Sequence, residues 1–406
     1  MKFSKLSQLA LVSILGLGVA TLLSGCMLVT IDYIFVADST GSGPGSAGQI
    51  QTFAVDAETG ALRLTDNKPV PSGGSQPIAL AASAGYQDLY VANAGNKTVV
   101  HFTIAYSGAL TQKETTTLPF TPSGLAINTA QTALYVVGGT SPGQLAVYPL
   151  SSGAVGTLAS TITLKLPGFS SDIIVPTAVA VLPNNNNVYV AAYDQSAYNP
   201  GGTVSSSANP GWIFAYSVSS NGALTPVANS PYQAGVKPTS LATAPTNRFV
   251  YATDFASNQV IGYAVMSDGT LNFLVNGPFK TGNEPASVVV DPRGMYLYVA
   301  NSLQNTVSAY AIAQSSGTPS AVINVSGSSV NATDTSPVST WTVSATFPPR
   351  WIAGSPTAAL SPRLSSSWIP IFPVPAPVST CPSGWREPSS SGGCGLPCRP
   401  FPTVTR

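Results

Sequence analysis

The stretch Leu297-Tyr298-Val299-Ala300-Asn301 decides the fold, because close copies of it recur along the chain. Each copy is a short apolar run with an aromatic residue near its start and a small or polar residue at its end. The other copies lie at 34–38, 89–93, 134–138, 188–192 and 250–254. Repetition at intervals of similar length indicates an array in which each copy belongs to one structural unit.

A proline followed by small or polar residues and an apolar strand precedes every copy except the first. These prolines are Pro77, Pro122, Pro176, Pro238, Pro285 and Pro337, the last of which begins a further unit. Their spacing of 45 to 62 residues is the size of a four-stranded unit. A second alternating strand follows each aromatic strand, and turns such as Asn221-Gly222 and Asp268-Gly269 predict tight hairpins.

Four short antiparallel strands per unit, with no amphipathic helix between them, predict an all-β chain. One four-stranded unit cannot bury both of its faces alone, so we expect the units to pack radially as the blades of a β-propeller. Six blades are recognisable, and a seventh is expected but disrupted after Pro337. The expected domains are a lipoprotein signal peptide at 1–25, a propeller at 26–336 and a Pro/Ser/Trp/Cys-rich tail at 337–406.

The motif also carries a family resemblance. Residues 297–301, followed by Asn-Thr-Val at 305–307, resemble the YVTN repeat, and the Gly-Ala-Leu-Thr turns resemble those of lactonase-type seven-bladed propellers. The resemblance covers roughly residues 31–338. It implies the seven-bladed fold and a family that includes 6-phosphogluconolactonase-like enzymes and many exported propellers. No catalytic residue of that family carries over to this chain position by position.

The N-terminus predicts export and a lipid anchor. Lys2 and Lys5 precede an apolar run at 9–23, as in an export signal, and Leu23-Ser24-Gly25-Cys26 resembles the bacterial lipobox. We expect cleavage before Cys26 and acylation of its thiol; the alternative is an ordinary secretory signal with an incidental cysteine. Acyl chains would hold the protein on a membrane. Because Met27 replaces a retention Asp, we expect an outer-membrane anchor in the bacterial cell envelope, facing the periplasm or the surface.

Composition limits the chemistry. Charged residues make up 8% of the chain, and its formal net charge is +1, so we expect no nucleic-acid partner. We also expect no cofactor and no metal. The tail cysteines Cys381, Cys394 and Cys398 have no neighbouring His and make a poor zinc site; a disulfide would leave one of them unpaired.

Loops at one face of the propeller are expected to form any ligand site. Residues before the repeat prolines include Gln76, Lys237 and Glu284; residues after the aromatic strands include Asp38, Asn93, Asp194, Asp254 and Asn301. The alternative is that these Asn and Asp side chains only close turns. Two longer insertions, 39–49 and 193–212, enlarge the same face, and the second contains Tyr198.

The leading interpretation is a propeller that binds a ligand or protein, such as a neutral glycan, a peptide or an envelope protein. A lactone hydrolase and a surface scaffold without a small ligand are the alternatives. Hydrolysis needs an activated water and a group that stabilises the oxyanion, for which Glu284, Lys237 and Asp254 are the candidates. We expect His101, the only histidine, to be a packed strand residue. Three converging charges would favour an enzyme, whereas an aromatic or amide lining would favour binding.

The tail differs in composition from the rest of the chain. Residues 337–406 contain no Tyr, Asn, Gln, Asp, Lys or His, but hold four of the five Trp. This break falls inside the expected seventh blade, and we therefore hypothesise a shifted reading frame near residue 337. A genuine Pro/Ser-rich disordered tail is the alternative.

Overall fold

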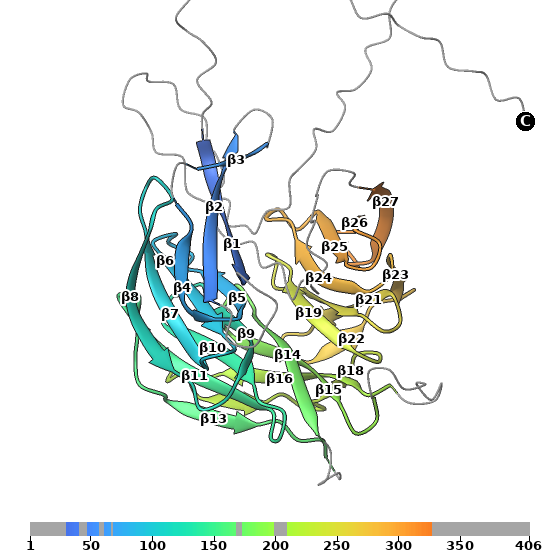
Figure 1. Cartoon of the computed structure of the whole chain (residues 1–406). Helices are drawn as coiled ribbons and strands as arrows, with labels where there is room; N and C mark the ends of the chain where they lie inside the picture. The colour runs from blue at the N-terminus through green and yellow to red at the C-terminus, as the bar shows by residue number, and fades with distance from the viewer. Residues whose placement is uncertain are drawn as a thin grey trace, which may run out of the picture. The chain divides into compact units, whose positions relative to one another are not determined.

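The computed structural model describes residues 30–39, 47–56, 61–65, 68–167, 173–198 and 209–326. All regular secondary structure in these residues is β-strand. The strands form six antiparallel sheets that follow one another along the chain (Figure 1). Each sheet contains one copy of the repeat and forms one blade. The predicted all-β propeller fold is confirmed.

The blades are numbered in chain order. Blade 1 contains β1 (Thr30–Ser39), β2 (Ala47–Asp56), β3 (Leu62–Leu64) and β4 (Val70–Ser75). Blade 2 contains β5 (Pro77–Ala82), β6 (Asp88–Asn93), β7 (Thr98–Ile104) and β8 (Leu110–Thr117). Blade 3 contains β9 (Pro122–Ile127), β10 (Ala133–Gly138), β11 (Gln144–Ser151), β12 (Ala154–Val155) and β13 (Ser160–Thr163). Blade 4 contains β14 (Ile174–Val181), β15 (Asn187–Asp194), β16 (Gly211–Val218), β17 (Leu224–Pro226) and β18 (Tyr232–Gln233). Blade 5 contains β19 (Pro238–Thr243), β20 (Phe249–Asp254), β21 (Gln259–Val265), β22 (Leu271–Phe273) and β23 (Phe279–Lys280). Blade 6 contains β24 (Pro285–Val290), β25 (Tyr296–Asn301), β26 (Thr306–Ile312) and β27 (Pro319–Ser326).

Blades 3, 4 and 5 have five strands instead of the expected four, because their outermost strand is divided in two. In blade 4, β17 and β18 both pair with β16. Pro231, just before β18, has no backbone N–H with which to continue a ladder. The Ser230 hydroxyl instead accepts a hydrogen bond from the Ala215 N–H at 2.9 Å, so a side-chain oxygen replaces a ladder acceptor.

The residue after each of the five repeat prolines in the described residues is a β-bulge, since the register of the innermost strand skips it. A bulge redirects a side chain away from the regular alternation. In three blades the bulged residue donates a side-chain hydrogen bond to the carbonyl of the next blade's proline. These bonds join Ser123 Oγ to Pro176 O at 2.6 Å, Thr177 Oγ1 to Pro238 O at 2.8 Å, and Thr239 Oγ1 to Pro285 O at 2.9 Å.

The tyrosine of the aromatic strand and the glycine of the turn are also partners across blades. The bonds run from Tyr90 Oη to Gly153 O at 2.6 Å, from Tyr189 Oη to Gly269 O at 3.0 Å, and from Tyr251 Oη to Gly317 O at 2.6 Å. All three glycines have φ between 73° and 84°, the left-handed region in which glycine is favoured. The tyrosine and the turn glycine of the repeat, which lie far apart in the sequence, therefore form one contact between neighbouring blades.

The hydrophobic core lies between neighbouring blades. One cluster joins Phe35 of blade 1 to Val100 and Phe102 of blade 2, and each later pair of neighbours shares a similar cluster. Tyr251 and Ala252, which point to opposite faces of β20, are both fully buried. Because every large side chain buried in this way contributes roughly 1.5–3 kcal/mol, the contacts between blades dominate the stability of the array.

Several predictions concern residues outside the described part of the chain: the signal peptide at 1–25, Cys26, the seventh blade and the tail at 337–406. The insertions at 39–49 and 193–212 are described only in part. Blade 1 has no innermost strand led by a proline among the described residues, as its sequence predicts. All described strands belong to the unit at 1–371, and no helix in the described residues could cross a membrane.

Candidate functional site

A pocket of about 310 Å³ lies where loops of blades 4, 5 and 6 meet. It is open to solvent, and its volume is at the lower end of the range of about 300–1,000 Å³ found for small-molecule sites. Its lining residues are Tyr198, Phe255, Ala256, Asn258, Asn283, Glu284 and Leu303. These residues lie in the loops that follow β15, β20 and β25 and in the loop that precedes β24. The sequence predicts a ligand site in these loops.

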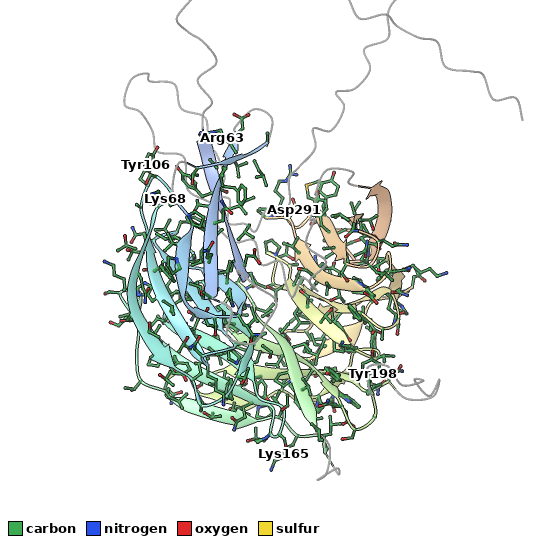
Figure 2. All side chains as sticks on the ribbon, viewed as in Figure 1. Arg63, Lys68, Tyr106, Lys165, Tyr198 and Asp291 are labelled. Atoms are coloured by element: carbon green, nitrogen blue, oxygen red, sulfur yellow. The ribbon has the colours of Figure 1, made fainter. Side chains whose placement is uncertain are left out.

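Tyr198, which comes from the second insertion, is 9% exposed, and Figure 2 marks its position. Its ring meets the Tyr193 ring edge to face, with 5.8 Å between the centroids. Burial raises the pKa of Tyr198 above its usual value, and the charges of Asp254 and Glu284 raise it further. Tyr198 therefore supplies the pocket with a neutral phenol and an aromatic ring.

Glu284 is the only carboxylate among the lining residues. Its backbone has φ of 54°, an uncommon conformation for a residue with a side chain. The Asn258 side-chain oxygen accepts a hydrogen bond from Glu284 N at 2.7 Å, while Ser302 N and Ser302 Oγ both donate to Glu284 O at 2.9 Å. Gln76, which also directly precedes a repeat proline, has the same conformation, whereas Lys237 in the equivalent position does not.

Lys237 lies against the aromatic side of the pocket. Its ammonium is 4.7 Å from the centroid of the Phe255 ring and 5.9 Å from those of Tyr193 and Tyr198. Burial lowers the pKa of Lys237, and the negative charge of Glu284 partly opposes this shift. The pocket therefore has one cation behind its aromatic wall and one anion in its lining.

Asp254 is fully buried and faces the backbone rather than the pocket. Its two carboxylate oxygens accept hydrogen bonds from Val236 N at 3.0 Å and Lys237 N at 2.9 Å, and Gln259 Nε2 donates a third at 3.0 Å. Asp254 thus fixes the loop that carries Lys237.

The other predicted face residues are not among those that line the pocket, although the Asp194 carbonyl accepts a hydrogen bond from Tyr198 N at 3.0 Å. Asn93 is buried and bonds to Ser72, Asp194 is buried and accepts from Ser196 N, and Asn301 is buried and donates to hydroxyls in β26. Asp38 is exposed near the end of β1. In the structure, the three buried side chains hold the ends of aromatic strands.

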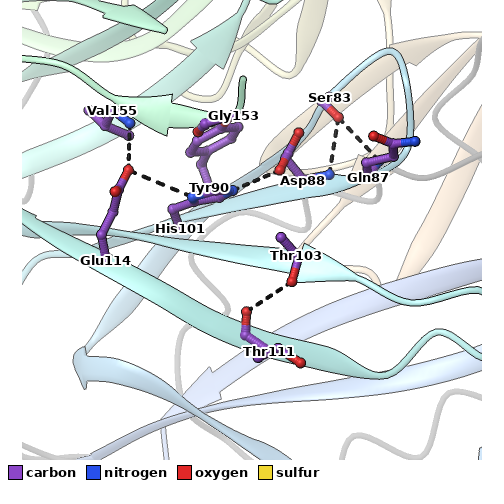
Figure 3. A network of polar contacts seen from close by, with 10 residues as sticks. All are labelled: Ser83, Gln87, Asp88, Tyr90, His101, Thr103, Thr111, Glu114, Gly153 and Val155. Atoms are coloured by element: carbon purple, nitrogen blue, oxygen red, sulfur yellow. Dashed lines mark hydrogen bonds and ion pairs between the residues drawn. The ribbon is translucent and has the colours of Figure 1, made fainter. Parts of the chain in front are cut away.

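Phe255, Asn258 and Asn283 were not predicted from the sequence. A signal was present, because Phe255 directly follows an aromatic strand and Asn283 lies two residues before a repeat proline. His101 lies in blade 2, outside this lining, and is buried beside Asp88 and Glu114 (Figure 3). Among the described residues, no group of three His, Cys, Asp or Glu side chains is arranged to hold a metal ion.

Comparison with known proteins agrees with this fold. Residues 213–332 match the family model described as Lactonase, 7-bladed beta-propeller. A candidate 6-phosphogluconolactonase from Bacteroides uniformis aligns at 17% identity over 72% of this chain and 82% of that chain, with a TM-score of 0.57. A functionally unknown protein from Desulfotomaculum acetoxidans aligns at 16% identity over 73% of this chain and 80% of that chain, with a TM-score of 0.54. No curated protein sequence matches. The resemblance to lactonase-type propellers is confirmed.

Proposed function

We propose that this lactonase-like propeller hydrolyses a neutral sugar lactone in the pocket between blades 4, 5 and 6. The observation that carries the proposal is Glu284, a carboxylate held by a clamped backbone in the lining, with the Lys237 ammonium nearby. The match of residues 213–332 to a lactonase family supports the reaction class. The proposal replaces the binding module favoured by composition alone.

Glu284 is the general base in the proposed reaction. Its carboxylate takes a proton from a water molecule as the water oxygen attacks the lactone carbonyl carbon. The tetrahedral oxyanion then collapses, the ring C–O bond breaks, and the departing alkoxide takes the proton from Glu284. The product is the open-chain hydroxy acid, and Glu284 is regenerated as a carboxylate.

Lys237 and the amides assist in this scheme. The ammonium adds a positive potential beside the site, and the side-chain N–H groups of Asn258 and Asn283 are the available donors to the oxyanion. The rings of Tyr198 and Phe255 offer apolar faces to the C–H side of a sugar ring.

A neutral substrate suits the charges better than a phosphorylated one. Glu284 would repel a phosphate in the pocket, and Lys237 is a single, half-buried cation behind aromatic rings. Between Met27 and Ser336, fourteen acidic residues outnumber nine basic ones.

Turnover of gluconolactone above its spontaneous rate tests the proposal. Glu284→Gln keeps the shape but removes the base, so we expect its kcat to fall by about 10²–10⁴-fold. Glu114→Gln, which changes a glutamate in blade 2, is the matched control and should retain activity. Equal rates for wild-type protein and Glu284→Gln would exclude this mechanism.

Sugar binding without turnover is the second candidate. It is favoured by the two aromatic rings and two amides in the lining, which contains one charged residue rather than three. Calorimetry with gluconate separates the two functions, because a binding module would retain gluconate in Glu284→Gln while neither protein hydrolyses the lactone.

A further inference from the structure

The only histidine of the chain lies between two carboxylates in blade 2 (Figure 3). His101 Nε2 is 2.8 Å from Asp88 Oδ1, and His101 Nδ1 is 3.6 Å from Glu114 Oε1. The imidazole stacks on the Tyr90 ring, with centroids 5.1 Å apart and planes 15° apart. Its side chain is 5% exposed, whereas that of Glu114 is 37% exposed, so protons can reach the cluster through Glu114.

The geometry suits an imidazolium better than a neutral imidazole. An ionised Asp88 only accepts hydrogen bonds, so Nε2 must carry a hydrogen. In the neutral ring, Nδ1 would then present a lone pair to Glu114, and Nδ1 is a buried atom without a hydrogen-bond partner in the described residues. A second proton would direct an N–H at Glu114 and place a positive charge between two negative ones.

The residues around His101 reach across to blade 3. The Glu114 carboxylate accepts a hydrogen bond from Val155 N in β12. The Tyr90 hydroxyl donates to Gly153 O in the turn before β12. The carboxylate of Asp88 packs against the same turn, since a Cβ added to Gly153 would lie 2.5 Å from Asp88 Oδ1. All three neighbours of the imidazole therefore hold one short hairpin of the next blade.

We propose that His101 is a proton-operated latch between blades 2 and 3. Protonation of His101 holds the Glu114 and Asp88 carboxylates against the imidazolium. This keeps the hairpin at Gly153–Val155 packed against blade 2. The titratable groups that face the ring are Asp88 and Tyr90 on β6 and Glu114 on β8, while the hairpin of blade 3 contributes backbone groups only. The latch is thus closed while the imidazolium is present, and it loosens as rising pH removes that proton.

Nuclear magnetic resonance on the full-length protein tests the latch directly. Because there is one histidine, its Cε1–H signal reports the protonation of His101 without ambiguity. Hydrogen exchange at the Val155 amide, corrected for intrinsic rates, reports docking of the hairpin. We expect protection at Val155 to fall about tenfold along the same pH curve as the imidazole signal. Protection that stays constant while the imidazole titrates would overturn the proposal.

Three variants separate a latch from a merely buried histidine. His101→Gln cannot titrate and should give Val155 protection that is independent of pH over this range. Glu114→Gln keeps an acceptor for Val155 N but loses the charge, so the pH dependence should become smaller. Lys113→Gln, an exposed charge change on the same strand, should leave the curve unchanged. If His101→Gln does not fold, Glu114→Gln decides: an undiminished pH dependence in this variant rejects the latch.

Discussion

Lys237 and Glu284 occupy the same place in two consecutive blades, directly before the proline that begins an innermost strand. Their surroundings give them different environments. Lys237 is enclosed by three aromatic rings, whereas Glu284 faces the open pocket, with its backbone held by Asn258 and Ser302. One repeat position thus supplies both charges of the proposed site.

The first prediction concerns the alkaline limb of lactone hydrolysis. Burial lowers the pKa of Lys237, so its ammonium is lost at a lower pH than that of an exposed lysine, and activity should decline there. Lys237→Arg stays charged and should extend activity to higher pH. Lys237→Met should lose about 10–10²-fold in kcat/KM at neutral pH, somewhat less than loss of a direct oxyanion donor. Initial rates across a pH series, corrected for spontaneous hydrolysis, measure both effects; identical alkaline limbs for all three proteins would contradict the assignment.

The second prediction compares two buried tyrosine hydroxyls. Tyr251→Phe removes the bond to Gly317 and leaves a buried carbonyl without its donor, so the free energy of unfolding should fall by about 1–2 kcal/mol. Tyr148→Phe removes a buried hydroxyl that has no hydrogen-bond partner in the described residues, and it should be neutral or slightly stabilising. Urea denaturation of both variants gives the comparison. Equal losses would show that the link to Gly317 adds nothing.

At the scale of elements, the innermost strands of blades 3, 4 and 5 each join the next blade through the bulged residue after the proline. The bulge turns a hydroxyl out of its own sheet and towards the neighbouring strand. These bonds lie at the start of the innermost strands, whereas the tyrosine-to-glycine bonds end at the hairpin turns. Blades 4 and 5, and likewise blades 5 and 6, are therefore joined at two separate places.

The third prediction follows from the bulge. Thr177→Val keeps the shape of the side chain but removes the donor to Pro238, and we expect a loss of about 0.5–1.5 kcal/mol in the free energy of unfolding. Thr225→Val, in the exposed edge strand β17, should change stability by less than about 0.5 kcal/mol. Chemical denaturation monitored by circular dichroism distinguishes the two. A Thr177→Val protein as stable as wild type would mean that the bond to Pro238 makes no net contribution.

The elements differ in how far sequence could predict them. The aromatic strands are readable because tyrosine and small apolar residues recur at fixed places. The divided outer strands could not be predicted in this way. A proline such as Pro231 can either end a strand or interrupt it. Which of the two occurs depends on whether a nearby hydroxyl, such as that of Ser230, accepts a hydrogen bond from the backbone N–H of the neighbouring strand.

The candidate site was partly predictable for a similar reason. Lys237 and Glu284 follow from the repeat, since every residue before a repeat proline belongs to the same set of loops. The aromatic wall does not follow, because Tyr198 and Phe255 come from different blades. Their proximity depends on the path of the chain from the end of β15 to Tyr198, for which the sequence contains no repeat.

At the scale of the whole molecule, the fourth prediction is that Cys26 carries the mature N-terminus and is acylated. Mass spectrometry of the protein purified from membranes should find a lipid-modified Cys26 and no residue before it. Cys26→Ala should move the protein from the membrane fraction to the soluble fraction, because the acyl chains would supply the anchor. An unmodified Cys26, or unchanged fractionation of the variant, would refute the prediction.

The bond from a bulged hydroxyl to the next proline also bears on how such a gene can change over generations. The repeats led by Pro176 and Pro238 bring both a hydroxyl donor at the bulge and a carbonyl acceptor at the proline, so a repeat of this kind duplicated or deleted between two prolines would meet its new neighbour through the same chemistry. Positions 78 and 286 hold Ile and Ala, whose side chains have no hydroxyl to donate such a bond. The same bond recurs at the three borders where the bulged residue has a hydroxyl, so a change of blade number at these borders would need no new kind of polar contact.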